Sequence, residues 1–233
     1  MKVLFIVPSF NAEKNIDTLV ASLDEQTDDR WSCLIIDDIS EDSSWSKISS
    51  INHPKIFSMR NTKKRFALRN IVSHARMYQE RDDVIIAVID GDDSLCNKDT
   101  VSHLIGAYED NIEVVWTAHS WDINGMNISR DMPENVDPYS WPWCSSHLRT
   151  FKSSLLSKIH NDNFKDTEGN WFERGYDQAL MLPVLHVSSG RKFLPEVCYR
   201  YNINSVSIKD RSWEEKKQHS TVNIVRSRGF VTK

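Results

Sequence analysis

At its centre the chain reads Val84-Ile85-Ile86-Ala87-Val88-Ile89-Asp90-Gly91-Asp92-Asp93. The apolar residues of this segment are mostly β-branched, which predicts a strand buried on both faces within a parallel sheet. The strand delivers a cluster of carboxylates to its carboxyl end, the edge where open α/β sheets bind their ligands. The cluster predicts either a solvated acidic turn or a site for a hard divalent cation such as Mg²⁺ or Mn²⁺.

The sequence before this strand alternates between short apolar runs and amphipathic segments. Strands are expected at residues 3–7, 33–36 and 56–59, and helices at residues 13–26, 45–51 and 65–78. This alternation predicts an α/β fold with a mostly parallel central sheet, helices on its faces and right-handed crossovers.

The sequence after the acidic strand is less regular. Helices are expected at residues 100–110, 150–159 and 176–185, strands at 113–118 and 197–203, and a hairpin at Asn124-Gly125. The basic segment 213–233 predicts a terminal helix that is either solvated or packed near the site, and the solvated helix is favoured because charge runs usually face water.

The composition is that of an ordinary globular chain. With 233 residues, 39% hydrophobic and 27% charged, one domain is the simplest organisation. The net charge of −4 means that the chain as a whole is not basic, so its overall charge does not indicate binding to nucleic acid or to an anionic membrane. The sequence holds no apolar run long enough for a spanning helix, and its first residues indicate a strand and not a signal peptide. The cysteines are widely spaced, which argues against zinc or a disulfide framework and fits a cytoplasmic protein.

Polar residues follow three of the expected strands and suit a nucleotide. They are Pro8-Ser9-Phe10-Asn11, Asp37-Asp38 and the cluster Asp90 to Asp93. Arg65 opens a helix near the same edge, where it would bind the nucleotide or remain a surface cation. The chain contains no glycine-rich phosphate loop of the dinucleotide-binding or P-loop type, so those sites are unsupported.

Four successive segments resemble the motifs of family 2 glycosyltransferases with the GT-A fold. The segments are Val7-Pro8-Ser9-Phe10-Asn11-Ala12, Leu34-Ile35-Ile36-Asp37-Asp38, Ala67-Leu68-Arg69-Asn70 and Val88-Ile89-Asp90-Gly91-Asp92-Asp93. Their order and spacing match over about the first 95 residues. Later segments around Arg149, Asp177 and Tyr201 also resemble the family.

The resemblance implies a metal-dependent, inverting enzyme that moves one sugar from a nucleotide-diphosphate sugar, by default a UDP-sugar, to an acceptor hydroxyl. Nucleotide-binding roles fall on Pro8, Ser9, Asn11, Asp37, Asp38, Arg65, Asp90 and Gly91. The ligands of Mn²⁺ or Mg²⁺ would be Asp92, Asp93 and His147. Asp177 would be the general base that deprotonates the acceptor. Acceptor contacts fall on Trp141, Trp143, Arg149 and Tyr176.

The resemblance also implies the organisation of the chain. Residues 1–210 would form one GT-A domain with a nucleotide-binding half over 1–95 and an acceptor-binding half over 96–210, followed by a basic helix or tail over 211–233. The family usually has Glu-Asp where this chain has Tyr176-Asp177, so the acidic neighbour of the base is lost. The chain lacks the Gln-x-x-Arg-Trp signature of processive synthases, which favours transfer of a single sugar.

Several positions have structural alternatives. Asp177 is also suited to capping a helix, His147 to a purely structural role, and the Trp141-Pro142-Trp143 loop to packing in the core. Residues 89–95 also resemble the motif of haloacid-dehalogenase-like phosphatases, with Asp90 as nucleophile and Asp92 as acid/base. A third possibility is a nucleotide-binding module without catalysis. A calcium loop is excluded because Leu95 and Val101 stand where Gly and Glu are required. The acceptor remains open among glycan, lipid-linked sugar, protein and nucleic acid.

Overall fold

The computed structural model describes residues 1–109, 111–203 and 208–232. Its strands are β1 (Lys2–Ser9), β2 (Trp31–Asp37), β3 (Ile56–Arg60), β4 (Val84–Val88), β5 (Ser94–Leu95), β6 (Val114–Trp121), β7 (Arg149–Lys152) and β8 (Arg191–Tyr201). Its α-helices are α1 (Ile16–Asp24), α2 (Ser44–Ser49), α3 (Phe66–Ala75), α4 (Thr100–Ala107), α5 (Tyr176–Val187) and α6 (Ile208–Arg228). Short 3₁₀ helices cover Arg76–Tyr78, Ser153–Lys158 and Asn161–Phe164.

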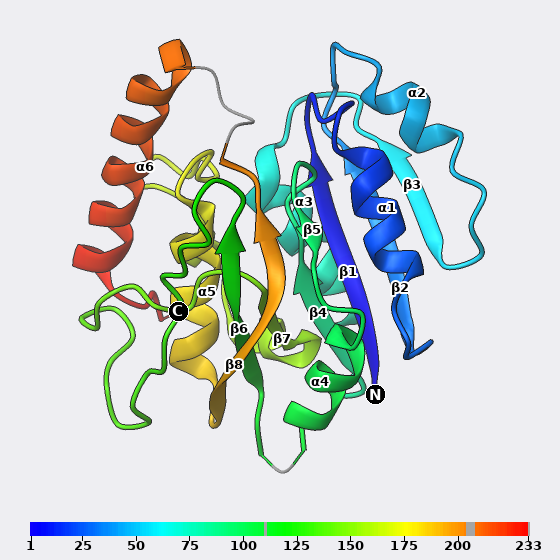
Figure 1. The fold of residues 1–233 in the computed structure, drawn as a ribbon. Coiled ribbons are helices and arrows are strands. Elements are labelled where there is room, and N and C mark those ends of the chain that lie inside the picture. Colours follow the sequence, from blue (N-terminus) through cyan, green and yellow to red (C-terminus); the bar gives the residue numbers. More distant parts are fainter. Residues whose placement is uncertain (110, 204–207, 233) are drawn as a thin grey trace.

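The strands form one sheet in the order β3-β2-β1-β4-β7-β6-β8-β5 (Figure 1). The four strands from β3 to β4 are parallel, as predicted from the alternation of strands and helices. Beyond β4 the directions are mixed, because β7 runs antiparallel to both β4 and β6. The predicted α/β fold with a mostly parallel sheet in a single domain is confirmed.

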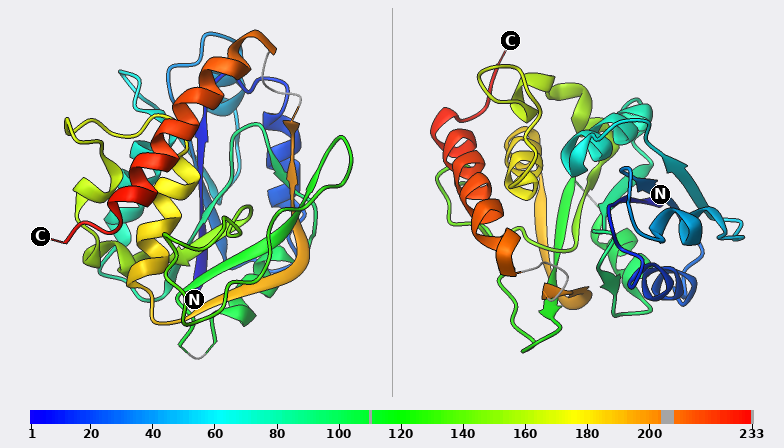
Figure 2. Two further views of the ribbon diagram at one scale, coloured as in Figure 1. Left: turned by 90° about the vertical axis from the view of Figure 1, so that its left-hand side faces the viewer. Right: turned by 90° about the horizontal axis from the view of Figure 1, so that it is seen from above.

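Helices cover both faces of the sheet (Figure 2). Alternate residues of β4 join two different hydrophobic clusters, one packed under α3 and α5 and the other under α1, α2 and α4. Every residue of β4 is buried, because successive side chains of a strand point to opposite faces and both faces are covered. The predicted central strand is therefore found, and its carboxyl end lies in the middle of the sheet edge.

The helix expected at residues 150–159 is wrong. Arg149–Lys152 is strand β7, and only the following residues form a 3₁₀ helix. Thr150 pairs with Ala87 of β4 and with Val115 of β6, so pairing with distant strands overrides the local pattern. This short strand places Arg149 beside the end of β4.

Two other expectations hold in part. The Asn124-Gly125 turn forms, with Gly125 at φ +70° and its N–H donating to the carbonyl of Trp121. The residues directly after the turn do not form the second strand of a hairpin, since the next strand is β7. The helix expected to reach residue 110 ends at Ala107, and residue 110 itself lies outside the described residues.

The terminal helix α6 packs against α5, as both views of Figure 2 show. Val225 is buried against the core, and Arg226 donates to the backbone carbonyls of Tyr139 and Trp141 at 2.8 and 2.9 Å. These contacts match the packed helix and not the solvated one that the charge run favoured. None of the described helices has the length and apolar character that crossing a membrane requires.

Candidate active site

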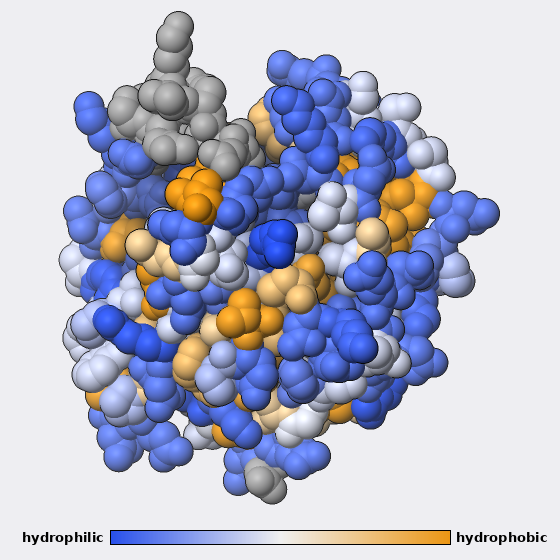
Figure 3. All heavy atoms as spheres, in the orientation of Figure 1, coloured by the Kyte–Doolittle hydropathy of each residue, from blue (hydrophilic) through white to orange (hydrophobic). Residues whose placement is uncertain are grey.

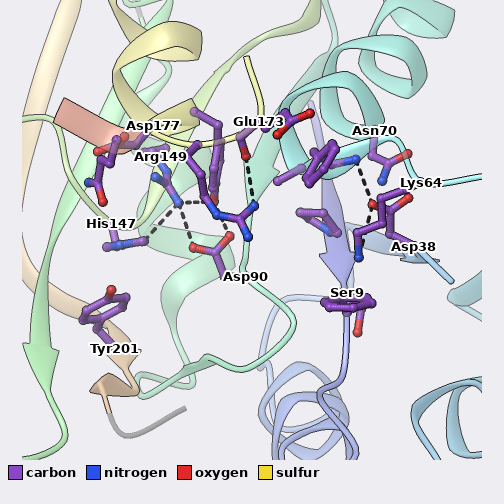
Figure 4. A pocket seen from close by; sticks show the side chains of 18 residues that line it. Ser9, Asp38, Lys64, Asn70, Asp90, His147, Arg149, Glu173, Asp177 and Tyr201 are labelled. Carbon is purple, nitrogen blue, oxygen red and sulfur yellow. Dashed lines mark hydrogen bonds and ion pairs between the residues drawn. The ribbon is translucent and has the colours of Figure 1, made fainter. Parts of the chain in front are cut away.

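A pocket of about 300 Å³ lies at the carboxyl ends of β1 and β4 (Figure 4). The first turns of α3 and α5, the segment that begins β7, and Gln218 of α6 complete its walls. On the face shown in Figure 3, apolar residues form separate patches among hydrophilic ones. Predicted site residues that line the pocket are Pro8, Ser9, Asp38, Asp90, His147, Arg149, Tyr176 and Asp177.

Asp38 connects the end of β2 to the start of α3. Its buried carboxylate accepts hydrogen bonds from the backbone N–H groups of Arg65 and Phe66, at 2.9 and 2.8 Å. The side-chain amide of Asn61 donates to the same carboxylate at 2.7 Å. The first N–H groups of a helix have no partner within the helix, so the carboxylate stabilises this terminus. Asp38 thereby holds the first turn of α3 against the pocket.

Three side chains near this turn carry donors without a hydrogen-bond partner. They are Ser9 Oγ, Lys64 Nζ and Asn70 Nδ2, which are buried and line the pocket. Lys64 Nζ also forms an ion pair with Oδ2 of Asp38 at 3.9 Å. Asn70 is held in place, since its Oδ1 accepts from the side-chain amide of Asn61 at 2.9 Å. Burying a donor without a partner costs free energy, so unpartnered donors converging on one pocket point to a ligand with acceptor atoms.

Aromatic rings flank the same end of the pocket. The ammonium of Lys64 lies over the ring of Phe10 and 5.9 Å from the centroid of Phe66, and the guanidinium of Arg174 lies 5.6 Å from that centroid. Phe66 has φ +60°, a conformation that a bulky residue keeps only where its surroundings hold it, and Asp38 supplies that hold. Flat rings beside donors suit a nucleobase.

Asp90 occupies the other end of the pocket and is held from three sides. Its carboxylate accepts hydrogen bonds from the hydroxyl of Tyr176 and, at 3.2 Å, from Nη2 of Arg149. Its backbone N–H donates to the hydroxyl oxygen of Tyr199 at 3.1 Å. Tyr176 was expected to contact the acceptor, but its hydroxyl is bound between Asp90 and Arg149. The tyrosine that replaces the family's usual glutamate therefore joins a hydrogen-bonded network.

Arg149 lies at the centre of that network. In β7 it pairs with Val88 of β4 and Trp116 of β6, so the strand order brings it beside the acidic cluster. Arg149 is buried, with 1% of the residue exposed, and its Nη2 donates to Tyr176 at 2.8 Å and to His147 Nδ1 at 3.1 Å. Its Nε has no hydrogen-bond partner. Because arginine keeps its proton in proteins, this position carries a permanent positive charge.

Asp93 lies behind Asp90 and is buried. Its two carboxylate oxygens accept hydrogen bonds from the hydroxyl of Tyr199 at 2.6 Å and from the backbone N–H of Asn202 at 2.7 Å. Burial, together with the charges of Asp92 and Asp90, raises the pKa of Asp93 well above its ordinary value. Negative charge at this position is therefore under-compensated by the protein.

His147 is fixed by stacking between two tyrosines. Its ring centroid lies 4.6 Å from that of Tyr199 and 4.9 Å from that of Tyr201. Burial, and next the charge of Arg149, hold the pKa of His147 well below its ordinary value, so the ring is neutral. Arginine can only donate, so Nδ1 accepts the bond from Arg149 and the ring proton lies on Nε2.

Asp90, Asp93 and His147 form a group that could hold a metal ion, with ligand atoms within 4.8 Å of one another. Two of the predicted ligands, Asp93 and His147, belong to this group. Asp92 does not, and the third member is Asp90, which was predicted to bind the nucleotide. Carboxylate oxygens fit Mn²⁺ or Mg²⁺, and each keeps a second lone pair beside its present hydrogen bond. The acceptor lone pair of His147 is already used by Arg149, so a metal ion and Arg149 would compete for it.

Asp177 lies in the first turn of α5, and its carboxylate lines the pocket. Burial raises its pKa, an effect that the charge of Arg149 partly opposes. A carboxylate with a raised pKa in a pocket has the properties of a general base.

Three residues that were predicted to contact the nucleotide do not line the pocket. The side-chain oxygen of Asn11 accepts a hydrogen bond from the backbone N–H of Glu41 at 2.9 Å. Asp37 is fully buried and pairs with Arg60 at 3.0 Å. Arg65 does not line the pocket either. The structure therefore gives these residues contacts that shape the loops around the pocket.

Gly91, Trp141 and Trp143 also differ from their predicted roles. A Cβ on Gly91 would lie 2.8 Å from Cβ of Ser9, so glycine allows the ends of β1 and β4 to approach each other. The two tryptophans are partly buried against the main hydrophobic cluster and do not line the pocket. This is the packing in the core that the sequence left open for the tryptophan loop.

The sequence prediction missed part of the pocket wall. The missed residues are Phe10, Lys64, Phe66, Ala67, Asn70, Glu173, Arg174, Gly175, Tyr201 and Gln218. One signal was available, since Asn70 is a polar residue on the apolar face of an amphipathic helix that also carries Ile71 and Ala75. The contributions of α6 and of the segment before α5 have no comparable local signal.

Comparisons with known proteins agree with the sequence motifs. The family model described as glycosyl transferase family 2 matches residues 4–175. The search of curated proteins gives no match. Among solved structures, TarS from S. aureus in complex with UDP-GlcNAc has a TM-score of 0.65 at 17% identity, over 89% of this chain and 60% of that chain.

A second similar structure is the mannosyltransferase PcManGT from Pyrobaculum calidifontis in complex with GDP-Man and Mn²⁺. It has a TM-score of 0.66 at 16% identity, and the match covers 100% of this chain and 66% of that chain. Another TarS structure is matched over 87% of this chain but only 37% of its own length. The chain thus spans less than two thirds of these structures, and at such low identity the likeness establishes the fold.

Proposed function

The chain belongs to glycosyl transferase family 2, and from that premise we propose that it transfers one sugar from a nucleotide-diphosphate sugar to an acceptor hydroxyl. The observation that carries the proposal is that the buried donors of Ser9, Lys64 and Asn70, at one end of a single pocket, have no hydrogen-bond partner. Unused donors of this kind gain hydrogen bonds only when a ligand with acceptor atoms enters.

The proposed donor is a UDP-sugar. Uracil offers carbonyl oxygens, which suit the unpartnered donors, and a ring N–H, which suits the carboxylate of Asp38. Phe10 and Phe66 would flank the base. The solved structures of TarS with UDP-GlcNAc and of PcManGT with GDP-Man show that relatives of this fold bind nucleotide-sugars with different bases. The base is therefore part of the experimental test.

In the proposed reaction, Asp177 accepts the proton of the acceptor hydroxyl. The acceptor oxygen then forms a bond to the anomeric carbon while the bond from that carbon to the diphosphate breaks, with inversion. The electron pair of the broken bond leaves with the nucleoside diphosphate. A divalent cation, Mn²⁺ or Mg²⁺, bound by Asp90 and Asp93 would neutralise charge on that leaving group.

Competing functions are less well supported. A phosphatase mechanism needs Asp90 as a free nucleophile, whereas both of its carboxylate oxygens accept hydrogen bonds from Tyr176 and Arg149. A basic tail of this kind would suit a nucleic-acid acceptor. Arg226 and Arg228 are instead committed to backbone carbonyls within the protein, so they do not argue for that acceptor.

The test is thermal unfolding with a panel of nucleosides, nucleoside diphosphates and their sugars, with and without Mn²⁺ or Mg²⁺. We expect one base to raise the unfolding temperature, since a ligand that binds the folded state stabilises it. Ala67 lines the pocket on α3, so Ala67→Trp should fill the pocket and abolish the shift. Ser73→Trp, on the same helix but outside the pocket, is the matched control and should keep it.

The nucleotide-sugar that shifts the unfolding temperature is then assayed for release of its sugar and for transfer to candidate acceptors. Binding without any turnover would favour the module that lacks catalysis. If wild type responds to none of the nucleotides, or if Ala67→Trp responds as wild type does, the proposed donor pocket is wrong.

A further inference from the structure

Arg149 is a buried cation placed inside an acidic metal motif. Its guanidinium bonds to Asp90 and to His147, two of the three members of the candidate metal group. Figure 4 shows these bonds converging on Arg149 in the middle of the pocket wall. The protein thus already places one positive charge where a diphosphate would meet a metal ion.

The surroundings of Arg149 fix its position before any ligand binds. His147 cannot turn away, because its ring is stacked between Tyr199 and Tyr201. The hydroxyl of Tyr176 binds Nη2 of Arg149, and the guanidinium also lies 4.9 Å from the centroid of that ring. A charge held in this way needs little reorganisation when an anion arrives, which is the property of a preorganised electrostatic site.

Arg149 also keeps a donor that no residue uses. Its Nη2 is shared by the carboxylate of Asp90, the imidazole of His147 and the phenol of Tyr176. Its Nε is buried and has no hydrogen-bond partner. Arginine presents its donors in a planar fork that matches the oxygens of phosphate. Arg149 therefore has both charge and a donor available for an anionic ligand.

We propose that Arg149 binds the diphosphate of the donor, with His147 and Tyr176 as positioning residues, so that the diphosphate adds affinity even without a divalent cation. This inference rests on the proposed function, since it assigns a role within the same pocket. It moves Arg149 from the acceptor side, where the resemblance placed it, to the leaving group. It also gives His147 the role of holding Arg149.

The experiment measures the affinities of uridine and UDP by calorimetry in buffer with EDTA. Uridine and UDP carry the same base, so the ratio of their affinities measures what the diphosphate adds to binding. We expect UDP to bind at least about tenfold more tightly than uridine to wild type, and Arg149→Met to lose most of that ratio while its uridine affinity is kept. Arg149→Lys, which retains a charge, should keep part of the ratio. Lys152→Met, in the same strand but outside the pocket, should leave it unchanged.

Tyr176→Phe provides a second variant that removes no charge, and it decides the case if Arg149→Met does not fold. It should lower the UDP-to-uridine ratio by about two- to tenfold, because Arg149 loses one anchor, without changing uridine affinity. The inference is overturned if UDP gains affinity over uridine only when Mn²⁺ is added, and by the same factor in wild type and Arg149→Met. Binding of neither compound to wild type, with every other nucleotide of the panel also inactive, would instead reject the proposed function.

Discussion

The two ends of the pocket differ in how far the protein satisfies its own polar groups. At the end near α3, the donors of Ser9, Lys64 and Asn70 have no hydrogen-bond partner. At the end near β7, the side chains of Asp90 and Arg149 bond to each other and to Tyr176, and Nε of Arg149 is the buried donor left without a hydrogen-bond partner among these three residues.

This difference separates two tasks within one site. Unpartnered donors gain hydrogen bonds only when a ligand arrives, so the end near α3 is suited to binding and selection. Groups that already hold one another keep fixed positions through a reaction, so the end near β7 is suited to stabilising charge that develops there. Substitutions at the two ends should therefore change different measured quantities.

The largest effect is expected for Asp177→Asn, beside the hydrogen-bonded end. Loss of the proposed base should lower the transfer rate by about 100- to 10,000-fold and leave nucleotide affinity nearly unchanged. Because burial raises the pKa of Asp177, the wild-type rate should fall on the acid side at a pH above the ordinary range of aspartate. Initial rates against pH measure both quantities. Asp82→Asn, an exposed carboxylate outside the pocket, is the control, and equal rates in both variants would contradict the assignment.

A smaller effect on stability is expected from His119, which contacts the ring of His147. Burial lowers the pKa of His119 from 6.5 to about 4, and its ring bonds to Ser129 and Trp121. Between these two pKa values the unfolded chain binds more protons at His119 than the folded protein does. The free energy of unfolding therefore falls as the pH falls. Between about pH 7 and about pH 5 this group should remove about 2 kcal/mol from the free energy of unfolding.

Denaturant unfolding at the two pH values measures that loss. His119→Gln should lose less stability between the two pH values than wild type does. His219→Gln, at an exposed position of α6, should keep the wild-type pH dependence. If His119→Gln loses as much free energy of unfolding between the two pH values as wild type does, this histidine does not remain neutral in the folded protein.

The smallest effect is expected at the end near α3, and it compares two buried serines. Ser9→Ala removes a hydroxyl without a partner, so nucleotide affinity should fall about two- to tenfold while stability stays nearly constant. Ser44 Oγ accepts from the backbone N–H of Ala12 and donates to Asp42, so Ser44→Ala should cost about 1 kcal/mol of stability and no affinity. Calorimetry measures the nucleotide affinity of both variants, and denaturant unfolding measures their stability. If Ser9→Ala lost stability and Ser44→Ala lost affinity, the distinction between the two ends would be wrong.

The first part of the fold was predictable because its signals are local. Each early strand is an apolar run followed by an amphipathic helix, and burial on both faces makes β1 and β4 stand out. The same regularity placed Ser9, Asp38 and Asp90 at one sheet edge.

The second part depended on contacts that the local pattern does not contain. β7 has four residues, and it is a strand because β4 and β6 lie on either side of it. The resemblance therefore identified the segment that holds Arg149, while the proximity of Arg149 to Asp90 became visible only through the strand order. Asn70 was missed because a buried polar residue in a helix is informative only once its unpartnered atom is known.

The wall formed by α6 has a consequence for the order of events during synthesis. Pro8 and Gln218 line the same pocket, so the pocket receives its first and last side chains from distant parts of the chain. While the ribosome is still making the segment before α6, β1 to β4 can already pair, but the pocket still lacks the wall that Gln218 supplies. A nascent chain would therefore acquire its ligand-binding cavity late, after most of its hydrophobic core has formed.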